Sequence, residues 1–265
     1  MVSSPNKRSR SSAGSLGVVE LWVLGANGTY PTAGRPTAGY LLSHRDTRVW
    51  IDAGSGTFGA LLELMDPADL DALIISHMHV DHCADVFALY HYLRFGPGDR
   101  PPLPLIVPAG AVERLSAFLD SGGGSHLAEA FAPHTPTPGE VVPVGTMVFR
   151  FGPSDHPVPT LQVRAEAEGR SITYSADTGT GSDLVALATG ANTLLAEATF
   201  PGLDKPAPHH LTATEAGQIA HQAGVERLIL THLMPTLDPQ QSIAEAAAVF
   251  GGDVMVAAPN LEVLI

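Results

Sequence analysis

Cysteine is almost absent from this chain of 265 residues, since Cys83 is the only one. A disulfide within the chain is therefore excluded, and a reducing compartment suits the composition. Long apolar runs are also missing: none approaches the roughly 20 residues that span a bilayer. Residues 1–16, with Lys7, Arg8 and Arg10 among serines, lack the apolar stretch of a secretory signal. We expect a cytoplasmic protein with no membrane segment and a disordered leader over residues 1–16.

Basic residues are scarce as well. Lysine and arginine total 14 against 27 aspartates and glutamates, which gives a formal charge of -13. This balance argues against broad affinity for nucleic-acid backbones. Hydrophobic residues make up 45% of the chain, enough for a sizeable core. No change in composition marks an interdomain linker, so we expect one domain over residues 17–265.

What the sequence does contain is a dense group of metal ligands in the run Ser-His-Met-His-Val-Asp-His at residues 76–82. Three imidazoles and one carboxylate follow the apolar run 73–75, and neutral imidazole is the commonest protein ligand for zinc-like metals. Adjacent side chains point in different directions, so one short turn can serve two metals. The spacing predicts metal-dependent hydrolysis.

Further candidate ligands recur where strands are predicted to end. His156 follows strand 147–151, Asp177 follows a hairpin, and His232 follows strand 228–230. Strand ends at one sheet edge are the expected place for a site. A lone histidine is usually a structural or surface residue. We expect this of the remaining histidines, which are His44, His91, His126, His134, His209 and His221. Together with the first cluster, however, the later ligands can fill two coordination spheres.

The combined pattern resembles a known superfamily. His77-x-His79-x-Asp81-His82, with the later ligands, is similar to the metallo-β-lactamase fold from about residue 18 onward. Residues 195–200 (Leu-Ala-Glu-Ala-Thr-Phe), 210–212 (His-Leu-Thr) and 230–232 (Leu-Thr-His) resemble the ribonuclease Z branch. The resemblance implies an α/β fold, a four-layer αββα sandwich of two facing mixed sheets with the metals at one edge.

The resemblance also implies a ligand set. One divalent metal takes His77, His79 and His156, the other takes Asp81, His82 and His232, and Asp177 bridges both. Two metals about 3.5–4 Å apart need such a shared anion to reduce their repulsion. The number of imidazoles favours zinc, with manganese or iron as alternatives. Cys83 is not needed as a ligand and is expected to pack against the site.

These parts suggest a mechanism. Two metals that share a water lower its pKa and hold hydroxide in line with a phosphorus or carbonyl centre, and Asp81 would orient that hydroxide. His210 is the candidate acid for a phosphodiester leaving group, just ahead of a helix whose N-terminus attracts phosphate but disfavours imidazolium. Glu197 matches the family position of the carboxylate that counters this effect. The ordinary alternatives are an exposed strand-end carboxylate for Glu197 and a solvent-facing loop residue for His210.

The segment between the third histidine and the bridging aspartate bears on the substrate. Ribonuclease Z clips the 3′ trailer of transfer-RNA precursors, and its family carries a long RNA-binding arm in this segment. Here residues 157–176, 20 in all, separate the two ligands, enough for a hairpin only. The chain is therefore most similar to armless actinobacterial relatives that hydrolyse cyclic nucleotides such as cyclic AMP.

We accordingly expect a dinuclear metal-dependent phosphodiesterase whose partner is a small phosphodiester rather than a large RNA. Alternatives are a transfer-RNA 3′-processing endonuclease, and a sulfatase or lactonase on the same fold, since fold does not fix substrate. A non-catalytic, metal-stabilised binding module is a further alternative. It is disfavoured because a structural zinc is normally closed by four ligands. Relatives of this fold are often dimers, so a homodimer is an additional expectation.

Overall fold

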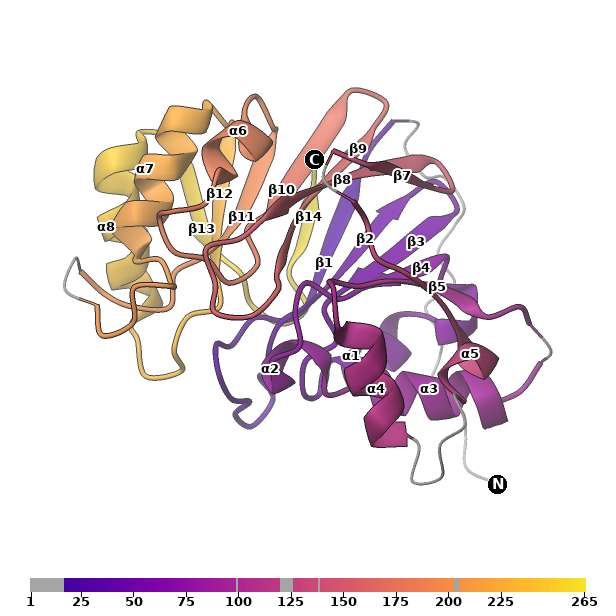
Figure 1. Cartoon of the computed structure of the whole chain (residues 1–265). Coiled ribbons are helices and arrows are strands. Elements are labelled where there is room, and N and C mark those ends of the chain that lie inside the picture. The colour runs from indigo at the N-terminus through magenta and orange to yellow at the C-terminus, as the bar shows by residue number, and fades with distance from the viewer. Residues whose placement is uncertain (1–16, 99, 120–125, 138, 203–204) are drawn as a thin grey trace, which may run out of the picture.

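Two seven-stranded β-sheets face each other at the centre of the molecule (Figure 1). The computed structural model describes residues 17–98, 100–119, 126–137, 139–202 and 205–265. The leader predicted over residues 1–16 lies outside this part. Within the described residues, no helix is both long enough and apolar enough to cross a membrane.

The first sheet has the order β14-β1-β2-β3-β4-β5-β6. Pairing is antiparallel from β14 to β3 and parallel from β3 to β6. The parallel half places the carboxyl ends of its strands at a common edge. The strands are β1 (Glu20–Gly25), β2 (Gly39–His44), β3 (Thr47–Ile51), β4 (Ala72–Ile74), β5 (Leu103–Ile106), β6 (Phe131–His134) and β14 (Glu262–Leu264).

The second sheet repeats this plan, with the order β13-β12-β11-β10-β9-β8-β7. Pairing is antiparallel from β7 to β10 and parallel from β10 to β13. Its strands are β7 (Val141–Val144), β8 (Met147–Pro153), β9 (Leu161–Ala167), β10 (Arg170–Tyr174), β11 (Thr193–Glu197), β12 (Arg227–Thr231) and β13 (Asp253–Val256).

Helices cover the outer face of each sheet (Figure 1). The first sheet carries α1 (Thr57–Leu64), α3 (Val86–Phe95), α4 (Ala111–Leu119) and α5 (Leu127–Ala130), together with the short α2 (Val80–Cys83) and the 3-10 turn η1 (Pro67–Asp69). The second carries α6 (Leu184–Ala188), α7 (Ala213–Ala223) and α8 (Pro239–Phe250). The predicted αββα sandwich is confirmed.

Three apolar layers hold this arrangement together. One lies between the sheets, one between the first sheet and its helices, and one between the second sheet and its helices. Strand β8 shows how the sequence builds the middle layer. Met147, Phe149 and Phe151 alternate along it and are buried between the sheets, and each contributes about 1.5–3 kcal/mol by leaving water. The alternation fixes which face of β8 is buried.

The outermost strands differ most from the sequence-based prediction. The proline-rich residues 133–139 are typical of a loop in sequence, but Pro133 and His134 end β6 at the edge of the first sheet. A proline is tolerated there because an edge strand does not need every N–H. Apart from Phe131, the strand is exposed, so it lacks the apolar alternation that marks a strand in sequence.

Candidate metal centre

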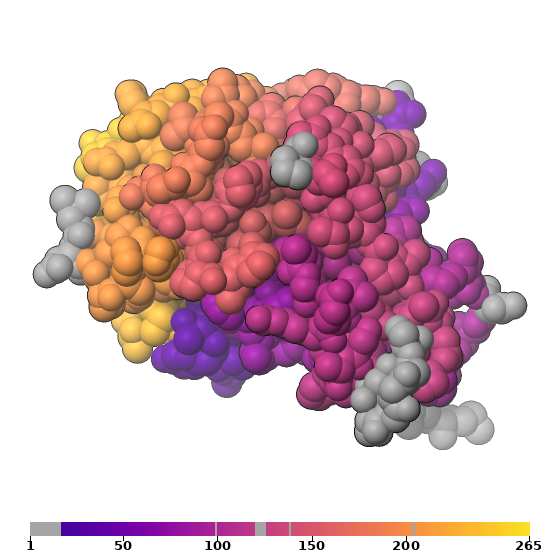
Figure 2. Space-filling model, in the orientation of Figure 1, coloured from indigo at the N-terminus to yellow at the C-terminus, as the bar shows by residue number. Residues whose placement is uncertain are grey.

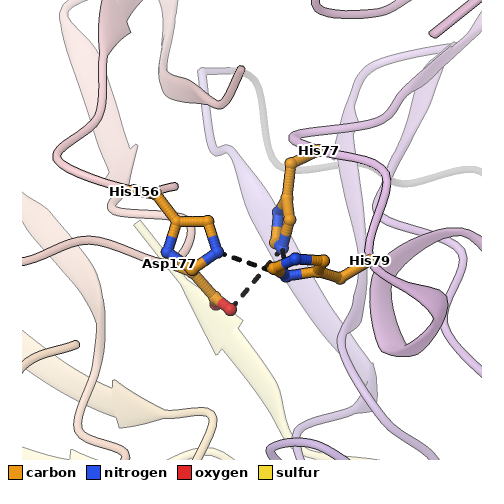
Figure 3. A group of neighbouring side chains, drawn as sticks. All are labelled: His77, His79, His156 and Asp177. Carbon is orange, nitrogen blue, oxygen red and sulfur yellow. Dashed lines mark hydrogen bonds and ion pairs between the residues drawn. The ribbon is translucent and has the colours of Figure 1, made fainter. Parts of the chain in front are cut away.

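The seven predicted ligands lie together at one edge of the sandwich, where loops from both sheets meet. The ligand atoms of His77, His79, His156 and Asp177 all lie within 4.8 Å of one another, as do those of Asp81, His82 and His232. Figure 3 shows the first group, with His77 and His79 on one side and His156 and Asp177 on the other. In the space-filling view, the purple surface of the first half and the salmon surface of the second meet along one seam (Figure 2).

The first group is built around the ring of His79. Its Nδ1 lies 3.0 Å from Nε2 of His77 and 3.2 Å from Nε2 of His156. Oδ2 of Asp177 lies 3.6 Å from Nε2 of His77. Ligand atoms around a tetrahedral ion bound at about 2.0–2.1 Å would be about 3.3 Å apart. The spacing therefore suits one divalent ion among these four side chains.

The second group faces the other oxygen of the same aspartate. Nε2 of His82 lies 3.1 Å from Nε2 of His232, and Nε2 of His232 lies 3.2 Å from Oδ2 of Asp81. Oδ1 of Asp177 lies 3.3 Å from Nε2 of His82 and 3.5 Å from Nε2 of His232. Asp177 thus turns one oxygen to each group, which is the geometry that a bridging ligand requires.

The local backbone explains how these ligands converge. Asp52, Ala176 and His232 follow strands β3, β10 and β12, and all three have positive φ angles, of 57°, 50° and 56°. This conformation costs a non-glycine residue of order 1–3 kcal/mol and turns the chain sharply. A close approach adds a second constraint, because a Cβ on Gly54 would lie 2.0 Å from the backbone oxygen of Asp81. The metal-ligand turn can pack against this loop only where a glycine stands.

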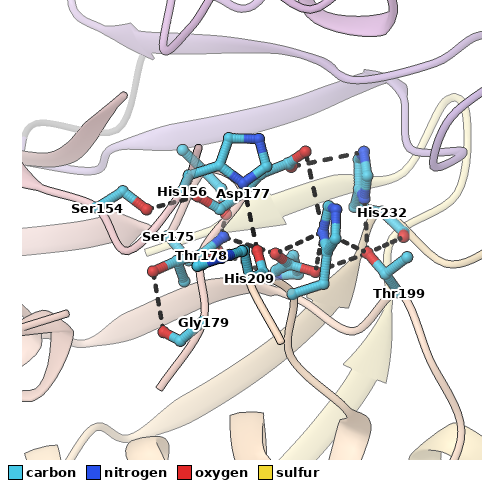
Figure 4. Close-up of polar contacts among 12 residues, drawn as sticks. Ser154, His156, Ser175, Asp177, Thr178, Gly179, Thr199, His209 and His232 are labelled. Atoms are coloured by element: carbon cyan, nitrogen blue, oxygen red, sulfur yellow. Dashed lines mark hydrogen bonds and ion pairs between the residues drawn. The ribbon is translucent and has the colours of Figure 1, made fainter. Parts of the chain in front are cut away.

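In four of the ligand histidines, the ring nitrogen that faces away from the ligand group has a hydrogen-bond partner, called its outer partner below. Nδ1 of His82 lies 2.8 Å from Oδ2 of Asp52, and Nδ1 of His77 lies 3.0 Å from Oγ of Ser76. The other two pairs are His232 Nδ1 with Thr199 Oγ1 at 2.8 Å and His156 Nδ1 with the carbonyl oxygen of His209 at 3.3 Å. Figure 4 shows Thr199 against His232. Such outer partners orient metal-binding imidazoles.

These partners also determine where the protons are. The Ser76 hydroxyl donates to Asp52, and the Thr199 hydroxyl donates to Oε2 of Glu197 at 2.6 Å. Both hydroxyl oxygens must then accept from the adjoining histidine, so His77 and His232 carry their protons on Nδ1. A carboxylate and a carbonyl only accept, which gives His82 and His156 the same tautomer. Their Nε2 lone pairs all face the site.

This arrangement fits a pair of metal ions. When both rings are neutral in the tautomers given above, Nε2 of His82 and Nε2 of His232 lie 3.1 Å apart with no proton between them, and among the described residues the buried Oδ1 of Asp177 accepts no hydrogen bond. Uncompensated buried polar atoms are costly. A divalent cation in each group would bind these nitrogen and oxygen atoms, and the carboxylate of Asp177 would offset part of the charge of both cations.

Burial keeps one set of ligands neutral. It lowers the pKa of His77 well below its usual range, lowers that of His79, and brings that of His156 to about 4. Neutral imidazole is the form that binds metal. At His82 burial also acts to lower the pKa, but the carboxylates of Asp177 and Asp52 outweigh it and raise the value. A bound cation would replace that extra proton.

The carboxylates of the site are ionised. Burial acts to raise the pKa of Asp177, but His232, His82 and His77 outweigh it and hold the value well below its usual range. Asp81 follows the same pattern, since the neighbouring His232 and His82 outweigh burial and lower its pKa. Its Oδ2 also accepts the backbone N–H of Thr29 at 2.8 Å. The site therefore offers two anionic ligands at neutral pH.

His210 and Glu197 form a pair beside the second ligand group. Nδ1 of His210 lies 3.0 and 3.2 Å from the two carboxylate oxygens of Glu197, and its ring is parallel to that of His232, with centroids 5.9 Å apart. Glu197 is fully buried rather than an exposed strand-end residue. His210 could itself bind a metal with Asp177 and His232, but its Nδ1 is 4.0 Å from Asp177. We assign that nitrogen to Glu197.

Sequence reasoning missed two supporting residues, Asp52 and Thr199. Asp52 directly follows β3, and its buried carboxylate accepts from Ser76, from His82 and from the Tyr174 hydroxyl at 2.8 Å. A carboxylate directly after a buried strand was the available signal, as it was for Asp177. Thr199 links Glu197 to His232; it lies in the run 195–200 that carries the ribonuclease Z resemblance, but a threonine there does not by itself indicate this contact.

Replacing Asp52 with asparagine is expected to weaken metal binding by about 10–100-fold, the usual cost of losing such a partner. The amide keeps the shape but offers one accepting oxygen instead of two and no charge to orient His82. Competition with a chelator, followed by metal analysis, measures the change. Asp71→Asn is the matched control, because Asp71 accepts a backbone N–H of Arg48 at the opposite end of β3. Equal affinities in both variants would contradict this role.

Cys83 packs in the apolar layer beneath the first sheet and is 5% exposed. Burial raises the pKa of its thiol to about 11, and none of the ligand groups found among the described residues contains it. A thiol of this kind is a poor metal ligand and a slow nucleophile. Cys83 is thus a packing residue, and its neighbours are the apolar side chains between the first sheet and its helices.

Comparison with known proteins now adds the family. Residues 47–233 match the family described as the Beta-lactamase superfamily domain. The chain belongs to the metallo-β-lactamase superfamily. Within this superfamily it is similar to the uncharacterized protein Rv1339 of Mycobacterium tuberculosis, at 36% identity over 247 residues, covering 91% of this chain and 90% of the relative. The predicted family resemblance is confirmed.

Two other members place the chain within the superfamily. The ribonuclease Z of Mycolicibacterium gilvum is 32% identical over 250 residues, covering 84% of this chain and 87% of the relative. The crystal structure of YhfI from Bacillus subtilis, a metallo-β-lactamase fold protein, has a TM-score of 0.84 at 26% identity and covers 94% of this chain and 100% of that one. The chain is therefore a metallo-hydrolase of this fold with ribonuclease Z-like relatives.

Proposed function

We propose that this metallo-hydrolase is a phosphodiesterase for a small diester such as a cyclic nucleotide. The observation that carries the proposal is the pair of His210 and Glu197, with Nδ1 and Oε1 3.0 Å apart beside a ligand group. A metal centre that only stabilises the fold needs no proton donor next to it. Cleavage of a diester with a basic leaving group does.

The two ligand groups would hold two divalent ions, with zinc favoured by the imidazoles. When bound, the ions would lower the pKa of a water molecule and offset the charge of the phosphoryl oxygens. The first ion would take His77, His79 and His156, the second would take Asp81, His82 and His232, and Asp177 would bridge them. Apart from His79, each of these histidines already turns Nε2 toward the site in the tautomer described above.

Asp81 has capacity left to orient the attacking water. Among the described residues, the polar contacts of its side chain fall on Oδ2, which faces Thr29 and His232, and 14% of the side chain is exposed. An ionised carboxylate accepts up to about four hydrogen bonds. Asp81 would therefore accept one from the water that attacks phosphorus.

His210 would protonate the leaving group from Nε2, because Nδ1 donates to Glu197. Burial acts to lower the pKa of His210, but the hydrogen bond and charge of Glu197 outweigh it and raise the value. A raised pKa keeps more of the imidazolium form at neutral pH, which is the form that donates. The side chain is 19% exposed, so a substrate can reach it.

The segment between His156 and Asp177 supports a small substrate. Residues 161–174 form the tight hairpin of β9 and β10, joined by Glu168 and Gly169. No residues are left in this segment for an RNA-binding arm. The net charge of -13 adds an unfavourable field for a polyanion.

A transfer-RNA 3′ endonuclease is the second candidate, and the similarity to the M. gilvum ribonuclease Z favours it. The same metal pair also suits sulfate esters and lactones, so these remain substrates to compare. We further propose a cytoplasmic location and a homodimer. Light scattering of the purified protein would test the latter, and a monomeric mass would overturn it.

Metal analysis followed by a parallel assay tests the proposal. The purified protein should contain two divalent ions per chain and hydrolyse cyclic AMP in preference to a precursor transfer RNA, an aryl sulfate and a lactone. Removal of the ions by a chelator should abolish turnover, and zinc or manganese should restore it. Trimming of the RNA without hydrolysis of cyclic AMP would overturn the proposed substrate.

A further inference from the structure

Lysine is rarer in this chain than the low basic content alone suggests. Lys7 and Lys205 are the only two, against 12 arginines. Lys205 lies in the connection from β11 to α7, the same connection that carries His210. Its side chain is only 12% exposed. The one lysine in the described part of the chain is thus turned inward beside the candidate acid.

The ammonium group of Lys205 has two oxygen partners. Nζ donates to the backbone oxygen of His210 at 2.6 Å and to Oε2 of Glu215 at 2.7 Å. Glu215 belongs to the capping box of α7, where it accepts the N–H of Thr212 at 2.8 Å and its own N–H is held by the Thr212 hydroxyl. Lys205 therefore ties the main chain of His210 to the first turn of a helix.

Among the described residues, the main chain around His210 has two other restraints, and one of them is the contact of Nδ1 of His156 with the carbonyl oxygen of His209 at 3.3 Å. Phe200 N–H donates to Leu211 at 3.3 Å, and within the described part of the connection no regular helix or strand occurs before α7. Without the contact at the carbonyl oxygen of His210, this segment of main chain could shift, and a shift of the His210 Cα would move the ring. The contact between Nδ1 and Glu197 sets the ring from one side, and Lys205 sets the backbone from the other.

We propose that Lys205 is a positioning residue that holds His210 in line for protonation of the leaving group. The proposal rests on the proposed function of His210. An ammonium suits this place because its three donors point in separate directions, here toward a carbonyl and a carboxylate. Lys205 transfers no proton and touches no substrate in this role.

Lys205→Met tests the contact, because the variant keeps the length of the side chain and removes the ammonium. We expect kcat on cyclic AMP to fall about 10–100-fold, the cost of a small misplacement of a catalytic group, with KM and metal content unchanged. Bis(4-nitrophenyl) phosphate has a weakly basic leaving group that needs little protonation. Its turnover should change less than threefold. A loss of stability alone would lower both activities equally.

Chemical rescue separates the charge from the shape. Lys205→Cys should show the same loss, and alkylation with 2-bromoethylamine should restore most of the activity by rebuilding an ammonium of nearly lysine length. Alkylation with iodoacetamide, which adds a neutral group, should not. Cys83 is buried with a raised thiol pKa, so the wild-type protein treated in parallel is the control for its reaction.

The outcomes distinguish the two proposals. If the wild type cleaves precursor transfer RNA instead of cyclic AMP, the proposed substrate is wrong. The variants are then compared on that RNA, because its leaving group is also a basic alkoxide. Lys205 keeps its role if Lys205→Met loses turnover there and the aminoethylated Lys205→Cys recovers it. Equal losses on both classes of leaving group, or rescue by iodoacetamide as well, would overturn the role of Lys205.

Discussion

Asp177→Asn is expected to lower kcat by about 10³-fold or more, equivalent to about 4 kcal/mol of transition-state stabilisation. The wild-type carboxylate turns Oδ2 toward the first ligand group and Oδ1 toward the second. An asparagine would bring an N–H₂ group toward one of them and remove the negative charge between the two proposed cations. Their mutual repulsion would then be unreduced, and at least one ion should be lost.

Elemental analysis of the purified variant measures that loss directly, with turnover of cyclic AMP as the second readout. Asp183→Asn is the matched control. Asp183 lies in the same loop region ahead of α6 and makes no side-chain cap to it. The bridging role would be contradicted if Asp177→Asn retained two ions per chain and wild-type turnover.

His210→Ala is expected to lower kcat on cyclic AMP by about 10²–10⁴-fold, the usual contribution of a positioned acid. Metal content should stay normal, because Nδ1 of His210 is bound to Glu197 rather than to a ligand group. KM should change little, since the proton transfer occurs only in the transition state. Turnover of bis(4-nitrophenyl) phosphate should fall far less.

His209→Ala is the natural control for this experiment. Nδ1 of His209 lies 3.0 Å from Oδ1 of Asp155, so the neighbouring imidazole is held by a different carboxylate. Its removal should leave the ratio of turnover of cyclic AMP to turnover of bis(4-nitrophenyl) phosphate unchanged. Loss of metal in His210→Ala would show that His210 is a ligand and that its role was assigned incorrectly.

Helices with capping residues and short buried strands could be predicted from the sequence, because neighbouring residues determine them. Thr212 and Glu215 have the spacing of a capping box, which is present with both of its hydrogen bonds, and Gly224 ends the helix with a φ of 64°. The buried strands before the ligands form as well, because short apolar runs stopped by polar residues need a sheet to cover them. The edge strands β6, β7, β13 and β14 were missed, because each is mostly exposed or short.

The candidate site likewise has a part that the sequence predicts and a part that it does not. The types and spacing of the seven ligands could be read from the sequence, because carboxyl ends of parallel strands gather at one edge. The residues that hydrogen-bond to the ligand histidines could not be read from the sequence. Asp52 serves His82 from 30 residues away and Thr199 serves His232 from 33, and a serine, threonine or aspartate near a strand end has many ordinary uses.

By itself the sequence determined the chemistry of this protein: the superfamily, the sandwich and the imidazoles and carboxylates that suit two metals. Only the tertiary structure decided which ring nitrogen of each histidine faces the site, which oxygen of Asp177 serves which group, and that Lys205 supports His210. The reason is that ligand type is a property of a residue, whereas proton position and orientation depend on hydrogen-bond partners that are distant in the chain and close only after folding.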